Sequence, residues 1–265
     1  MTLPLRSSPS HTPRPTPGRL PVVREGEDVV WDRSAATAMV RIERHAATGP
    51  AVWVRALCWP IVPNAWWLLQ QSWSNVCASR QSVGREPHVG TPSLSWVGQS
   101  APQLAAPFRE TQAEESSVAA LLARTPIQIS IGVCTASADT AAAQRETWAE
   151  CLGAYAEHLR LPGRSACTVV VSRGADADQD RGAIEALARA RVRMPESTWM
   201  QTLRLQFSRE EVSPLPLEAA SLVARSVAER LVDGPSIQAV LDVAVAKMAR
   251  VPAFLQRPAK SAKRR

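Results

Sequence analysis

The stretch Ile127-Gln-Ile-Ser-Ile-Gly-Val-Cys134 alternates apolar residues with polar or small ones, which is the side-chain period of a half-buried strand. Over residues 148–159 the apolar side chains recur at steps of three and four, which predicts an amphipathic helix. Residues 168–171 then form an uninterrupted apolar run, which is typical of a central strand covered on both faces. A second stripe of apolar residues at helical spacing begins at Ile184. In residues 203–207, apolar and polar residues alternate again, as in a strand. This order of strands and helices predicts an α/β layer fold with parallel pairing.

The composition changes along the chain and predicts four regions. Residues 1–21 are rich in Pro, Ser, Thr and Arg, and we expect them to be a disordered or extended leader. Residues 22–115 are rich in Trp and Pro and show no sustained period, so we expect an irregular N-terminal half. Residues 116–250 carry the α/β pattern, and residues 251–265 form a basic tail.

Tryptophan is concentrated in one part of the N-terminal half. Five of the nine tryptophans fall within residues 53–73. We expect these rings to pack over an edge of the sheet. A membrane-interface belt is the alternative, but Arg55 and the prolines at positions 60 and 63 interrupt any clean amphipathic stripe.

The net charge of +7 belongs to the C-terminus. Residues 247–265 contain seven basic residues and no acid, so the remaining chain has 24 basic and 24 acidic residues. The simplest interpretation is a solvated terminus. The functional alternative is a tail that attracts nucleic acid through four side chains, Lys260, Lys263, Arg264 and Arg265.

The cysteines and the N-terminus predict a cytoplasmic protein. The five cysteines are an odd number with no CxxC pair, which argues against a disulfide framework and a structural zinc site. The proline-rich N-terminus does not resemble a secretory signal. We also expect no membrane-spanning helix, because no apolar run reaches the length of about 18 residues that such a helix needs.

Acidic residues follow the predicted central strand. Asp176, Asp178 and Asp180 come directly after it, and Glu218 opens a later helix. Ligands of open α/β sheets gather beyond the carboxyl ends of the strands, so the position suits a divalent cation or a phosphate. If the domain is catalytic, we expect these four residues to act on a phosphodiester, with Asp178, Asp180 and Glu218 as Mg²⁺ ligands. The alternative is that the acids cap and charge-complement helix N-termini.

Several common catalytic and nucleotide-binding motifs are missing. The sequence has no G-x-S-x-G elbow, no G-x-G-x-x-G and no G-x-x-x-x-G-K-[ST]. Aromatic and basic residues do not interleave in the α/β half, which argues against an RNA-binding sheet of the stacking type.

Three stretches of the α/β half resemble an uncharacterised bacterial family with an RNase H-like fold. The stretches are residues 129–134, residues 168–173 and residues 213–224, the last of which is similar to that family's late helix of the form L-Q-x-A-D-x-V-A. The resemblance implies an RNase H-like sheet, mixed or parallel, with flanking helices, and chemistry that uses two Mg²⁺ ions. However, Ser221 stands where the family's helix carries its acid. The family also has an N-terminal strand with the sequence Asp-Glu-Ser, and no such strand precedes Ile127.

These departures lead us to expect a catalytically degenerate RNase H-like domain that acts on or binds nucleic acid. Two alternatives remain. One is a non-enzymatic interaction protein that uses the basic tail, and the other is a decayed or misassigned reading frame without a function.

Overall fold

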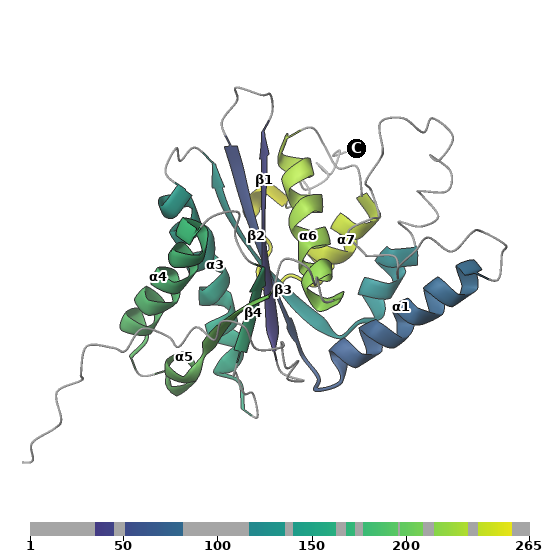
Figure 1. Ribbon diagram of the computed structural model, residues 1–265, viewed down its shortest axis with the longest axis horizontal. Coiled ribbons are helices and arrows are strands. Elements are labelled where there is room, and N and C mark those ends of the chain that lie inside the picture. Colours follow the sequence, from purple (N-terminus) through teal and green to yellow (C-terminus); the bar gives the residue numbers. More distant parts are fainter. Residues whose placement is uncertain are drawn as a thin grey trace, which may run out of the picture.

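The computed structural model describes residues 35–44, 51–81, 117–135, 140–162, 168–172, 177–195, 197–208, 215–232 and 238–255. These residues form one five-stranded sheet in the order β3-β2-β1-β4-β5, with helices on both of its faces (Figure 1). The strands are β1 (Ala36–Arg44), β2 (Ala51–Pro60), β3 (Ile127–Thr135), β4 (Thr168–Ser172) and β5 (Arg204–Ser208). The expected α/β class is therefore confirmed.

The sheet is mixed in direction. β2 pairs antiparallel with both of its neighbours, β1 and β3. β1, β4 and β5 pair in parallel with one another in that order. The expectation of parallel pairing is therefore right for β4 and β5. It is wrong for β3, which lies at the far edge of the sheet against β2.

The helices are distributed over the two faces. They are α1 (Ala65–Gln81), residues 117–124, α3 (Thr140–Leu159), α4 (Ala177–Arg193), α5 (Thr198–Thr202), α6 (Leu215–Val232) and α7 (Gln238–Ala246), followed by a 3-10 turn at Ala253–Leu255. In Figure 1, α3 and α4 lie on one side of the sheet, and α1, α6 and α7 lie on the other. The short helix α5 directly precedes β5 and is capped by Ser197, whose hydroxyl accepts from the Met200 backbone N–H.

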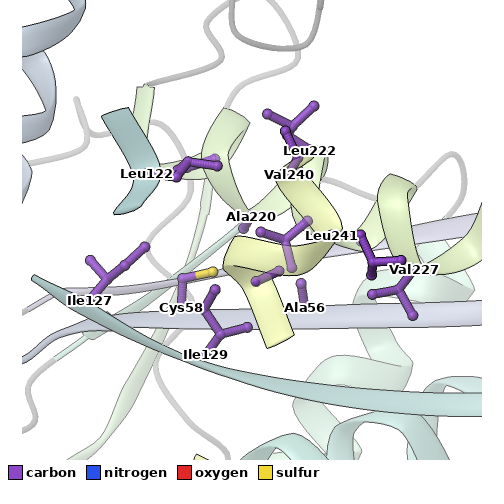
Figure 2. Close-up of a cluster of buried hydrophobic side chains, with 14 of the residues drawn as sticks. Ala56, Cys58, Leu122, Ile127, Ile129, Ala220, Leu222, Val227, Val240 and Leu241 are labelled. Atoms are coloured by element: carbon purple, nitrogen blue, oxygen red, sulfur yellow. The ribbon is translucent and has the colours of Figure 1, made fainter. Parts of the chain in front are cut away.

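The core on the α6 side is built from alternate residues of β2 and β3. Its members from the sheet are aliphatic or thiol side chains, and Figure 2 shows how they meet α6 and α7. They include Val54, Ala56, Cys58, Ile127, Ile129 and Ile131. Small residues of α6 such as Ala220 and Ala224 let this helix lie close to the sheet, because a short side chain keeps the backbones near each other.

The core on the α3 side uses the other face of the same strands. It joins Leu57 and Trp59 of β2 to the buried stripe of α3, which includes Trp148, Leu152 and Tyr155. Val169 and Val171 of β4 contribute to it as well. β4 is buried at Val169, Val170 and Val171, as expected for a strand covered on both faces.

The N-terminal half contributes two of the three central strands. β1 and β2 lie between β3 and β4, so the sheet does not begin at the boundary that we expected near residue 115. The tryptophans of this region pack as core residues: Trp53, Trp59, Trp66 and Trp73 are buried, whereas Trp67 is exposed. The leader at residues 1–21 lies outside the described residues.

Backbone groups on the outer edge of β3 are hydrogen-bonded by three different parts of the chain. The Ile127 N–H donates to the Thr125 carbonyl (2.8 Å), and the Val133 N–H donates to Oε2 of Glu150 (3.2 Å). Between them, the Ile129 N–H donates to the Lys247 carbonyl (3.0 Å), and the Ala249 N–H donates to the Ile129 carbonyl (2.9 Å). An edge strand whose backbone groups are paired in this way is protected from edge-to-edge association.

Lys247 is therefore part of the fold and not of a free tail. Its Nζ donates to the Thr125 carbonyl (2.7 Å) at the end of the helix over residues 117–124. Partial burial lowers the pKa of Lys247. The four basic residues that we expected to attract nucleic acid lie beyond residue 255, outside the described residues.

Candidate functional site

The carboxyl ends of β3, β4 and β5 lie at the same end of the sheet, because all three strands run in the direction of β1. We call this end the carboxyl edge. Each of these strands leads into a helix that begins at the carboxyl edge: β3 leads into α3, β4 into α4 and β5 into α6. In open α/β sheets this is the end at which ligands bind.

Three of the four acids expected from the sequence lie in the first turns of these helices. Asp178 and Asp180 fall in the first turn of α4, and Glu218 falls in the first turn of α6. Asp176 and the side chain of Asp178 lie outside the described residues. Asp180 is partly buried, and Glu218 is buried with only 7% of its surface exposed.

The sheet separates the two helices that carry these acids. α4 packs on the α3 side of the sheet and α6 on the other, so Asp180 and Glu218 can approach each other only around the carboxyl edge (Figure 1). Within the described parts of the chain, no three His, Cys, Asp or Glu side chains come together in a group that could hold a metal ion. The magnesium site with Asp178, Asp180 and Glu218 as ligands stays a prediction.

A different polar group, centred on Arg55, lies within the sheet between its middle and the carboxyl edge. Arg55 pairs with Val40 of β1 in the sheet register, one residue beyond the level at which β4 ends. Its side chain points toward α3 and is only 2% exposed. Nε donates to Oγ1 of Thr147 (3.3 Å), and Nη2 donates to Oε1 of Gln144. The guanidinium also lies over the Trp148 ring, with 4.2 Å between Cζ and the ring centroid.

Arg55 is a buried cation without an anionic partner. Both of its hydrogen-bond partners are neutral, and no carboxylate pairs with it among the described residues. Burial lowers the pKa of Arg55 to about 9, so the guanidinium is charged at neutral pH. A buried charge that lacks an opposite charge is costly, even where hydrogen bonds and an aromatic face offset part of its desolvation. Such a group therefore favours an anion at this end of the sheet and disfavours a divalent cation.

Two glycines allow α3 to lie close enough for these contacts. A Cβ on Gly132 of β3, the residue opposite Arg55, would lie 2.9 Å from the Cα of Thr147. A Cβ on Gly182 of α4 would lie 2.8 Å from the Cβ of Gln144. Because neither glycine has a side chain, the strand and α4 press Thr147 and Gln144 onto the guanidinium. An ion pair between Arg145 and Glu185 (3.9 Å) also joins α3 to α4.

The thiols near Arg55 are not reactive groups. Sγ of Cys151 lies 3.6 Å from the Arg55 carbonyl oxygen and 3.8 Å from that of Ser130. Burial raises the pKa of Cys151 to about 12, with Arg55 acting in the opposite direction. Burial also raises the pKa of Cys58 on the other face of β2. Since the thiolate is the nucleophile, both residues behave as small apolar side chains at neutral pH.

Sequence reasoning missed this cluster, although one signal points to it. Arg55 is the only charged residue in the strand Ala51–Pro60, and its neighbours on both faces are apolar. A charge that interrupts a fully buried strand is a candidate for a special role. Gln144 and Thr147 gave no such signal, because a polar residue on a helix is ordinarily assigned to the exposed face.

Comparison with models of protein families, with curated proteins and with solved structures finds no match to this chain. Among the described helices, none is long and apolar enough to cross a membrane.

Proposed function

We propose that this chain is an RNase H-like domain protein that binds nucleic acid without cleaving it. The observation that carries the proposal is the sheet itself. Three antiparallel strands in the order β3-β2-β1 are continued by β4 and β5 parallel to β1, which fits the mixed sheet with flanking helices that the RNase H-like resemblance implies. The resemblance of residues 129–134, 168–173 and 213–224 to an RNase H-like family supports the same assignment.

The carboxyl edge supports the loss of catalysis. Cleavage by two Mg²⁺ ions needs several carboxylates that converge on a scissile phosphate. In this chain β4 and β5 both end in serine, at Ser172 and Ser208, and Ser221 stands where the resembling family has an acid. Arg55 adds a buried positive charge in the half of the sheet toward this edge. The acids at Asp178, Asp180 and Glu218 then have a simpler role, which is to stabilise the N-termini of α4 and α6.

Charge supports nucleic acid as the partner. α3, α4 and α6 each begin at the carboxyl edge, on the two faces of the sheet, and the backbone N–H groups and dipole of a helix N-terminus favour anions such as phosphate. The basic residues Lys260, Lys263, Arg264 and Arg265 add a sequence-independent attraction to a polyanion.

Binding of labelled oligonucleotides to the full-length chain tests this proposal. We expect saturable binding of single-stranded or double-stranded DNA or RNA, measured by fluorescence anisotropy. The affinity should fall steeply with salt because each phosphate contact releases a counterion. A chain that ends at Leu255 should bind more weakly and with a shallower salt dependence. If the full-length chain binds no nucleic acid at low salt, the proposal is wrong.

A metal-dependent nuclease is the second candidate, favoured by the two aspartates in the first turn of α4. Calorimetric titration of Mg²⁺ and Mn²⁺ into the full-length chain distinguishes it. The nuclease assignment is correct if the metal ion binds saturably, if Asp178→Asn abolishes that binding, and if the Asp178→Asn, Asp180→Asn double variant loses cleavage. Asp242→Asn on the exposed face of α7 is the matched control, because it removes an acid far along the chain from both α4 and the first turn of α6.

A further inference from the structure

We draw no further inference here: the strongest candidate, the edge of β1 along residues 39–44, which continues past the residues that pair with β4, carries no proposal because nothing in the described part of the chain shows what covers it.

Discussion

Gly132 lies directly against the backbone of Thr147, so that the strand β3 and the helix α3 touch at this point. A Cβ on Gly132 would lie 2.8 Å from the Thr147 carbonyl carbon and would overlap the carbonyl oxygen. Real Cβ atoms do not approach backbone atoms so closely, and the backbone of a packed helix cannot turn aside as a flexible side chain can. The whole Arg55 cluster depends on this contact, because Thr147 accepts from Nε of Arg55.

We expect Gly132→Ala to lower the free energy of unfolding by about 1–3 kcal/mol or more, since one methyl group must push α3 away from the sheet. Gly153→Ala in α3 is the matched control. No heavy atom lies within 4 Å of its added Cβ, and alanine is favoured over glycine inside a helix by about 0.5–1 kcal/mol. Denaturant unfolding measures the change in the free energy of unfolding for each of the two variants. Equal effects of the two substitutions would mean that Gly132 does not set the approach of α3.

Replacements of Arg55 should separate the effect of its charge from that of its volume. We expect Arg55→Met to be neutral or stabilising by about 1–4 kcal/mol, because an apolar side chain of similar size avoids desolvation of the cation. Arg55→Ala should cost about 2–5 kcal/mol, because it leaves a cavity between β2 and Trp148. Denaturant unfolding in phosphate-free buffer gives both values. A large loss for Arg55→Met would show that the charge itself stabilises the fold.

The buried thiols should make the protein less stable above about pH 9. The pKa of Cys151 is raised to about 12 by burial, and that of Cys58 is raised as well, from an ordinary value of 9.0. Both groups keep their protons in the folded state while the unfolded chain loses them. Their contribution is therefore complete below pH 9 and declines as pH rises, by up to about 1.4 kcal/mol per pH unit for each thiol.

Unfolding by denaturant at several values between pH 8 and 10.5 measures this slope. Cys58→Ala and Cys151→Ala should each make it shallower. The lowered pKa of Arg55 acts in the opposite direction above about pH 9, because the unfolded chain then holds the extra proton. Arg55→Met should consequently steepen the decline. A slope that no cysteine substitution changes would show that other groups control the alkaline limit.

The sequence alone predicts the strands and helices in which apolar side chains recur at one fixed spacing. Residues 127–134, 148–159 and 168–171 each keep a single pattern, and each is part of the predicted strand or helix. The strands β1 and β2 were missed because of their positions in the sheet. β2 is buried on both faces from Val52 to Trp59, so its tryptophans, cysteine and arginine follow no period of two. Strand order is also set by contacts far apart in the chain, which no local pattern encodes.

The candidate site was less accessible to sequence reasoning than the fold. The aspartates after β4 were visible because they follow a strand and lie in one short segment. The Arg55 cluster draws its members from β2 and α3, with Gln144 separated from Arg55 by 89 residues. Only the register of β2 against β1 shows that Arg55 lies one residue beyond the level at which β4 ends. This information exists in the pairing of the strands and not in the sequence around Arg55.

The segment after α7 should control whether the edge of β3 stays closed. A chain that ends at Ala246 loses both backbone hydrogen bonds to Ile129 and the bond from Lys247 to Thr125. Exposed strand edges pair with other chains, so we expect this shortened chain to self-associate in a concentration-dependent way. Sedimentation or light scattering over a range of concentrations measures the effect. A chain that ends at Leu255 keeps all three bonds and lacks only the last ten residues, so it should behave as the full-length chain does. If both shortened chains associate equally, the effect belongs to residues 256–265, and the pairing at Ile129 does not protect the sheet.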